Sequence, residues 1–235
     1  MDTVTGFLLK LIAAVTMFID HAGLLLWDDA LWARAIGRIA FPIYAYLLAE
    51  GFRHTHDRKQ YFLRIFLLGL FCQIVYFLAG EPFLLGVLLV FSYSLILCEL
   101  VDRAKKSEGR TRAKWTLAFI GAAVAYLVFS IFFPCDYGIF GVLLPVMPTL
   151  FKPRERKTGL AAFSLCLAAL WLYSVFVTDF RVQIFGFLAL PFLYWYNGKP
   201  GKYRLKYFFY IFYPAHLGLL YLIAVYKATG GLKFW

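Results

Sequence analysis

Long apolar stretches, separated by short polar connectors, organise the whole chain. Nine apolar segments can be marked, most of them near the roughly 17–25 residues that cross a bilayer as a helix. They cover about residues 7–27, 31–51, 61–79, 83–101, 115–134, 138–151, 160–178, 181–196 and 207–226. The segments at 138–151 and 181–196 are short, so we expect half-helices or steep buried helices there. The pattern predicts an all-α fold, a polytopic membrane helical bundle of about nine transmembrane helices.

The composition supports this prediction. The chain has 235 residues, of which 63% are hydrophobic and 16% are charged, whereas soluble domains are nearer half apolar and a quarter charged. No stretch resembles a soluble domain, so we expect residues 1–235 to form a single transmembrane domain. The first apolar run lacks the basic start and the cleavage site of a signal peptide, so we expect it to remain as a helix.

The positive charge of the chain is concentrated in short connectors. The net charge is +11, which in a soluble protein would suggest binding to nucleic acid. Here the basic residues gather in four loops, at about 54–59, 102–114, 152–157 and 199–206, and the connectors between these loops hold few cations. Loops rich in Lys and Arg stay on the cytoplasmic side. All four fall on one side only if every segment crosses, so we expect nine crossings, a cytoplasmic N-terminus and no nucleic-acid partner.

Five ionisable residues interrupt three of the apolar segments: Asp20 and His21 in the first, Arg34 and Arg38 in the second, and His216 in the last. Such groups are costly inside a membrane and usually persist because they pair with one another or do chemistry. At 1.5 Å per residue, Asp20 and Arg38 each lie roughly 10 Å below the same membrane boundary. They can therefore meet across a helical hairpin, and Arg34 lies one turn from Arg38 on the same face.

The two histidines come from opposite ends of the chain. His21 points about 100° away from Asp20 around the helix axis, and His216 lies near the middle of the last segment. The two rings can therefore face one cavity. Structural interpretations remain open beside the catalytic one: Asp20 and Arg38 as a clamp, His216 as a core histidine, and His21 as an interfacial histidine.

The remaining polar residues give weaker signals. Glu50 can line an inner vestibule, whereas Asp136 and Tyr137 can either cap the helix that follows or form a lid. His54 and His56 are two residues apart and diverge on a helix, so we interpret them as a solvated loop rather than metal ligands. The four cysteines are widely spaced without a CxxC motif, and we assign them no disulfide, metal or nucleophilic role. No metal site is predicted.

Two longer motifs carry a family resemblance. The stretch MFIDHAG at 17–23 resembles the MxxDHxG opening of the TraX family, and GRIAFPIYAYLLAEGF at 37–52 resembles that family's GRxAFPxFxxLxxEGF. Further matches follow in the same order at about 55–64, 136–143, 196–201 and 209–217. The resemblance thus runs from about residue 9 to residue 225.

The resemblance implies an activity. The activity named for this family is N-terminal acetylation of pilin in conjugative systems, and the family looks like a distant relative of membrane acyltransferases. It implies an integral acetyltransferase of the bacterial cytoplasmic membrane, surrounded by lipid. Such an enzyme takes acetyl-CoA as co-substrate and uses an amine or hydroxyl acceptor, such as a pilin-like peptide or a glycan.

On this hypothesis the buried residues take roles. His21 acts as general base or acyl carrier, with His216 as its rival. Arg38 or Arg34 stabilises the oxyanion, and Asp20 pairs with Arg38. The CoA phosphates would bind at a basic inner mouth that adjoins Asn197 and includes Lys199, Lys202, Arg204 and Lys206. An alternative is a proton-coupled small-molecule transporter, because intramembrane Asp, His and Arg also build such proteins.

Overall fold

The chain is almost entirely helical. The computed structural model describes residues 4–78, 84–178, 180–202 and 206–229, and these contain helices, turns and two isolated β-bridges but no strand. The predicted all-α bundle is confirmed. The helices gather into two compact units. We call residues 1–44 with 173–235 the terminal unit and residues 45–172 the central unit.

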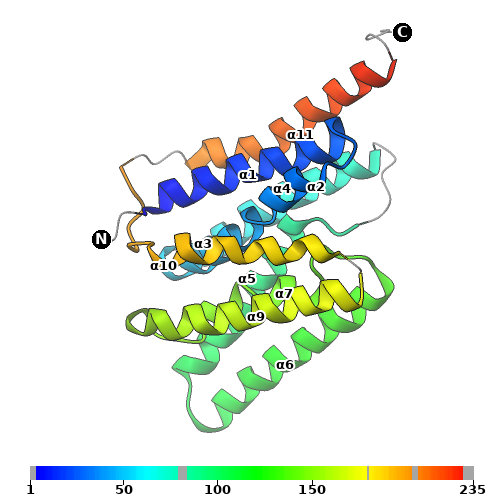
Figure 1. The fold of residues 1–235 in the computed structure, drawn as a ribbon. Coiled ribbons are helices and arrows are strands. Elements are labelled where there is room, and N and C mark those ends of the chain that lie inside the picture. Colours follow the sequence, from blue (N-terminus) through cyan, green and yellow to red (C-terminus); the bar gives the residue numbers. More distant parts are fainter. Residues whose placement is uncertain (1–3, 79–83, 179, 203–205, 230–235) are drawn as a thin grey trace. The chain divides into compact units, whose positions relative to one another are not determined.

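The terminal unit is built around the first helix of the chain. Helix α1 (Gly6–Leu26) packs against α2 (Leu31–Gly37) and α11 (Lys206–Thr229), which run beside it in Figure 1. The short 3₁₀ helix η2 (Arg181–Leu188) packs on α2 and continues into α10 (Ala189–Tyr194). The first residues of α3 (Ala40–His54) and the last of α9 (Arg156–Phe176) also belong to this unit.

The start of α1 is held by the loop that precedes α11. The Thr5 side chain caps the helix by accepting a hydrogen bond from the Leu8 N–H at 3.3 Å. The first two backbone N–H groups of the helix are satisfied by residues outside it. Gly6 donates to the Lys199 carbonyl at 2.8 Å, and Phe7 donates to the Pro200 carbonyl at 2.9 Å. These contacts join the N-terminal helix to the C-terminal part of the chain.

The central unit has α5 (Val87–Lys106) as its core. This helix contacts α4 (Arg58–Leu78), α6 (Gly109–Phe132), α7 (Gly138–Leu143) and α8 (Val146–Thr149), and it buries Val90, Phe91, Leu95 and Leu97. The 3₁₀ helix η1 (Pro153–Glu155) leads into α9. Near the first residue of α5, Leu85 and Cys135 form a parallel bridge. It joins the connector between α4 and α5 to the connector between α6 and α7.

Three of the nine predicted apolar segments are broken. The segment at 31–51 divides into α2 and α3 at the turn Arg38–Ile39, 138–151 divides into α7 and α8, and 181–196 divides into η2 and α10. Each contains proline within or near the break, at positions 42, 145, 148 and 191. Proline lacks an N–H and its ring crowds the preceding turn, which interrupts a helix. The two short segments were expected to be unusual, whereas the break at residue 38 was not foreseen.

The apolar exterior identifies a membrane protein. Among the described residues, five helical stretches are long and apolar enough to cross a bilayer: Gly6–Leu26, Arg58–Phe77, Gly109–Phe132, Pro153–Phe176 and Tyr210–Thr229. Large apolar side chains of α6 point outward, with Leu117 67% and Ile131 72% exposed. Exposed apolar side chains on a helix of this length are suited to lipid rather than water. The number of crossings and the side of the N-terminus stay predictions.

Candidate functional site

A buried carboxylate with two arginines forms the centre of the site. Arg34 Nη1 donates to Asp20 Oδ1 at 2.9 Å, and Arg38 Nη2 donates to Asp20 Oδ2 at 2.5 Å. The side chains are 15% exposed for Arg34, 7% for Arg38 and 10% for Asp20. The meeting of Asp20 with Arg38 that the depth argument predicted is confirmed. Both carboxylate oxygens are occupied, so the pairing offsets much of the cost of burying the charge.

Two glycines let α1 and α2 approach closely enough for this pairing. A Cβ at Gly37 would overlap the side chain of Asp20, and a Cβ at Gly23 would lie 2.5 Å from the Cβ of Ala33. The connecting turn holds Asp28 and Asp29 in the left-handed region, with φ of 50° and 57°, which aspartate tolerates better than most residues. The two glycines and the left-handed turn therefore allow α1 and α2 to form a closely packed hairpin.

The break after α2 places Arg38. Its backbone N–H contacts the carbonyls of the last turn of α2, and its Nε donates to the Arg34 carbonyl at 3.2 Å. Positive charge is favoured at a helix C-terminus, where the carbonyls are exposed. The Phe180 ring covers both guanidinium groups, at 5.2 Å from that of Arg38 and 5.9 Å from that of Arg34. Phe180 thus shields the ion cluster with an aromatic face.

The two histidines form a hydrogen-bonded chain. His21 Nδ1 lies 2.8 Å from His216 Nε2, and His216 Nδ1 lies 2.7 Å from the Phe212 carbonyl oxygen. A carbonyl only accepts, so His216 Nδ1 carries a proton, and in the neutral ring Nε2 is then the acceptor. His21 must therefore donate through Nδ1, which leaves its basic lone pair on Nε2. The chemistry of the partners assigns these tautomers.

The two histidine rings differ in burial and in the number of groups that contact them. His216 is 3% exposed and stacks on Phe212 at 4.7 Å, with Phe18 and Tyr213 also against its ring. His21 is half-buried, and no second hydrogen bond reaches its ring from the described part of the chain. It lies within electrostatic range of both guanidinium groups. The arrangement holds the His216 ring at both nitrogens and leaves the Nε2 lone pair of His21 without a hydrogen bond in the described part of the chain.

The predicted CoA-binding residues lie at the other end of α1. Asn197 Oδ1 accepts from the Lys199 N–H at 2.9 Å, and the Lys199 carbonyl binds Gly6. His21 lies 15 residues further along α1, roughly 22 Å at 1.5 Å per residue. Lys202 is exposed in the same loop, whereas Arg204 and the side chain of Lys206 lie outside the described residues. The loop is therefore separated from the histidines by most of a helix.

Glu50 belongs to the central unit and has partners of its own. Its Oε1 accepts from Arg53 Nη1 at 2.8 Å, and its Oε2 lies 3.6 Å from Nε2 of the exposed His54. Arg53 also donates to the carbonyls of Pro148 and Phe151. Glu50 therefore orients an arginine that ties α3 to the end of α8, and its role in an inner vestibule stays a prediction.

Asp136 and Tyr137 precede α7, also in the central unit. Tyr137 is the N-cap residue in a left-handed conformation, with φ of 61°, and no side chain caps α7. Tyr137 is thus the N-cap residue of α7 by its backbone, and its side chain makes no capping hydrogen bond. The turn is tight, because Gly138 has a φ of 53° and a Cβ at Gly141 would lie 2.6 Å from the Tyr137 Cβ and 3.0 Å from the Asp136 carbonyl oxygen. The interpretation as a lid stays a prediction.

The family model described as TraX protein matches residues 5–224. The chain belongs to the TraX family. A probable fimbrial assembly protein FimC, serogroup H1, of Dichelobacter nodosus is 31% identical over 92% of this chain and 94% of its own length. Protein TraX of Escherichia coli is 28% identical over 93% of this chain and 86% of its own length. No solved structure matches this chain.

Two residues of this TraX-family site were missed at the level of sequence. Phe180 covers the arginines, and Gln183 of η2 is buried, with an Nε2 that has no hydrogen-bond partner in the described part of the chain. A Cβ at Gly186 would lie 3.7 Å from that nitrogen and 3.5 Å from the Arg38 carbonyl, so η2 packs closely on the α2–α3 break. The sequence signal that pointed to Gln183 is that it carries the one amide side chain in the apolar segment 181–196.

Proposed function

We propose that this TraX-family protein is a membrane acetyltransferase that moves an acetyl group from acetyl-CoA to an amine or hydroxyl acceptor. The observation that carries the proposal is the chain from His21 through His216 to the Phe212 carbonyl, which leaves His21 Nε2 as an oriented base. Support also comes from the two relatives, whose names refer to TraX and to fimbrial assembly. A pilin-like N-terminus is the acceptor that those names favour.

The reaction needs one proton transfer in each direction. The acceptor nitrogen attacks the thioester carbonyl carbon, and His21 Nε2 takes the proton that this nitrogen loses. The tetrahedral adduct then collapses, the carbon–sulfur bond breaks, and the CoA sulfur leaves with the proton returned by His21. The products are the N-acetylated acceptor and CoA thiol. General base catalysis by a positioned histidine typically contributes 10²–10⁴-fold to the rate.

The second histidine assists by holding the first. When His21 Nε2 becomes protonated, its Nδ1–H still donates to His216 Nε2, so the new positive charge has an acceptor beside it. His216 is fixed in turn by the Phe212 carbonyl and the surrounding aromatic rings. This arrangement is analogous to the base and its orienting group in nucleophilic enzymes, where the third group keeps the imidazole in its correct tautomer.

The arginine cluster supplies fixed positive charge. Asp20 neutralises part of the charge of Arg34 and Arg38, which leaves the three groups with a net charge of one positive unit. A positive field in an enclosed site stabilises the negative charge that develops on the thioester oxygen. Arg34 is the better placed of the two arginines to contact substrate, because its side chain is the more exposed. Its Nε lies 3.2 Å from Asp29 Oδ1.

The donor would enter from the loop that precedes α11. CoA is elongated, with its phosphates far from its thioester, so phosphates at Lys199 and Lys202 and a thioester near His21 are compatible with their separation along α1. This binding mode assumes that the basic loop is cytoplasmic, as the positive-inside rule predicts. Asn197 orders the loop through its bond to Lys199.

The test is acetyl transfer by purified protein with labelled acetyl-CoA and a pilin-like peptide. His21→Asn keeps an N–H donor near the position of Nδ1 but has no basic nitrogen, so we expect turnover to fall at least 100-fold. His216→Asn should fall less, because His21 keeps its base. His54→Asn, at an exposed histidine of the central unit, is the matched control and should retain activity. Full turnover by His21→Asn at matched folding would refute the proposal.

A second candidate function is proton-coupled transport, and the broken helices favour it. Transporters often build their binding sites from discontinuous helices with intramembrane charged residues, and here the break at Arg38 adjoins such a cluster. Substrate uptake into liposomes that requires a proton gradient but no CoA would support transport. Acetyl transfer in detergent without any gradient would support the enzyme.

A further inference from the structure

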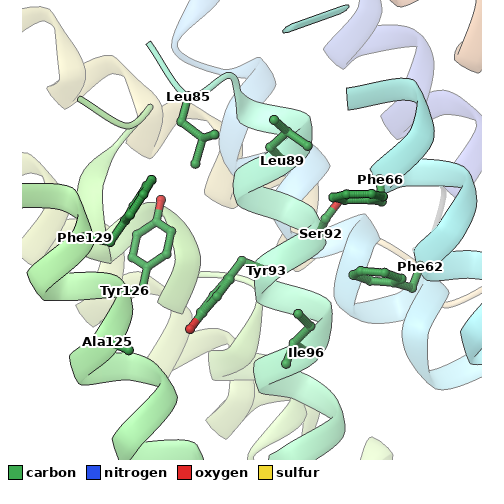
Figure 2. A pocket seen from close by; sticks show the side chains of 10 residues that line it. All are labelled: Phe62, Phe66, Leu85, Leu89, Ser92, Tyr93, Ile96, Ala125, Tyr126 and Phe129. Atoms are coloured by element: carbon green, nitrogen blue, oxygen red, sulfur yellow. The ribbon is translucent and has the colours of Figure 1, made fainter. Parts of the chain in front are cut away.

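An apolar slot lies in the central unit, and none of its lining residues belongs to the terminal unit. It has a volume of about 360 Å³ and is lined by side chains of α4, α5 and α6 and by Leu85. In Figure 2 the side chains of α4 and α6 flank those of α5. The lining residues are Phe62, Phe66, Leu85, Leu89, Ser92, Tyr93, Ile96, Ala125, Tyr126 and Phe129. This slot has no part in the proposed acetyl transfer.

Aromatic rings give the slot its shape. Phe62 and Phe66 stack one turn apart on α4, with ring centres 5.6 Å apart and planes 10° apart. Tyr93 of α5 packs against Tyr126 of α6 at 4.9 Å. Rings fixed by such contacts resist collapse into the space between them, so the slot persists as a cavity rather than closing by rotamer changes.

The few polar groups of the slot are turned away from it or enclosed. Ser92 Oγ donates to the Leu88 carbonyl at 2.8 Å, and the Tyr93 hydroxyl donates to the Ala122 carbonyl at 2.8 Å. The Tyr126 hydroxyl is enclosed by protein, beside the Cys135 thiol. A slot of this kind offers nothing to recognise a polar solute, and it would hold water poorly.

The setting of the slot identifies its occupant. Its flanking helices α4 and α6 are both long and apolar enough to span the membrane, and their outward side chains are apolar. Along α5 the slot runs roughly 10 Å from Leu89 to Ile96 at 1.5 Å per residue, and Leu85 in the connector before α5 lengthens it. The slot therefore matches the scale of one leaflet, half of the roughly 30 Å hydrocarbon core. We propose that the slot binds one hydrocarbon chain of a membrane phospholipid, with the headgroup toward the Leu85 end.

The first experiment is native mass spectrometry of the full-length protein after a delipidating detergent wash. We expect the protein to retain one phospholipid per chain. Ala125→Phe puts a ring into the slot and should reduce the retained fraction at least fivefold. Val124→Phe is the matched control, because this neighbouring residue of α6 is 51% exposed and does not line the slot. It should retain lipid as the parent protein does.

The second experiment needs no variant and therefore does not depend on folding of Ala125→Phe. A phosphatidylethanolamine with a photoreactive diazirine near one chain end is incorporated into nanodiscs with the protein, irradiated, and mapped by peptide mass spectrometry. We expect labelling at Phe62, Phe66 and Ile96 to exceed labelling at Leu117, a lipid-facing residue outside the slot, at least fivefold. Equal labelling at all four would overturn the proposal, as would equal lipid retention by the two α6 variants.

Discussion

Replacement of Asp20 by asparagine tests how the buried ion cluster stabilises the terminal unit. Asp20→Asn keeps the size of the side chain but removes the charge that both guanidinium groups share. Breaking a buried ion pair by removing one partner typically costs about 3–5 kcal/mol, because an uncompensated charge remains. Here two positive charges would be left, and Asp29, which lies 3.2 Å from Arg34, remains as an acidic partner for one of them. We therefore expect Asp20→Asn to lower the free energy of unfolding by about 3–5 kcal/mol.

The arginine variants should be milder, in a defined order. Arg38→Met leaves Asp20 paired with Arg34, so the loss is one charged hydrogen bond of about 1.5–3 kcal/mol. Arg34→Met should cost less than Arg38→Met, because Arg34 is the more exposed of the two arginines.

The assay is unfolding of the purified protein in mixed micelles, followed by circular dichroism, with the free energy of unfolding compared across the three variants. The triple variant Asp20→Leu, Arg34→Met, Arg38→Met should recover much of the stability of the parent protein, because it leaves no buried charge of the cluster unpaired. It should lose acetyl transfer. If Asp20→Asn were no less stable than Arg34→Met, the central place given to the carboxylate would be refuted.

Further predictions concern packing and pH. Gly37→Ala should destabilise by about 1–3 kcal/mol, because its Cβ would overlap the side chain of Asp20; Gly121→Ala, where a Cβ meets nothing, should be neutral or stabilising in the same unfolding assay. Burial by itself would raise the pKa of Asp102, which lies at the polar end of α5. Hydrogen bonds from Lys106 and Arg58 outweigh this effect and lower the pKa below its ordinary value of 3.8. The stabilisation by Asp102 is therefore complete well above pH 3.8 and is lost as the pH falls through the lowered value. Asp102→Asn should flatten the acid limb of a pH titration of unfolding, and an unchanged limb would contradict this.

The pairing across the first hairpin was predictable because depth in a membrane follows from counting residues. Asp20 and Arg38 were placed at equal depth from the sequence, and the structure brings them into contact. The juxtaposition of His21 and His216 was predicted only as one possibility, since residue counting gives the level of a ring but not the side of the helix from which it projects. Contact between α1 and α11 decides that, and no local pattern encodes it.

The sequence by itself determined the helical class, the positions of the apolar segments and the levels of the buried charges, because each depends on hydrophobicity and rise per residue along one helix. Tertiary structure alone decided the rest. It set the break at Arg38, the ring of Phe180 over the arginines, and the chain of bonds that leaves His21 Nε2 as the basic atom. These features depend on how helices distant in sequence rotate and pack against one another, and a one-dimensional pattern does not contain that rotation.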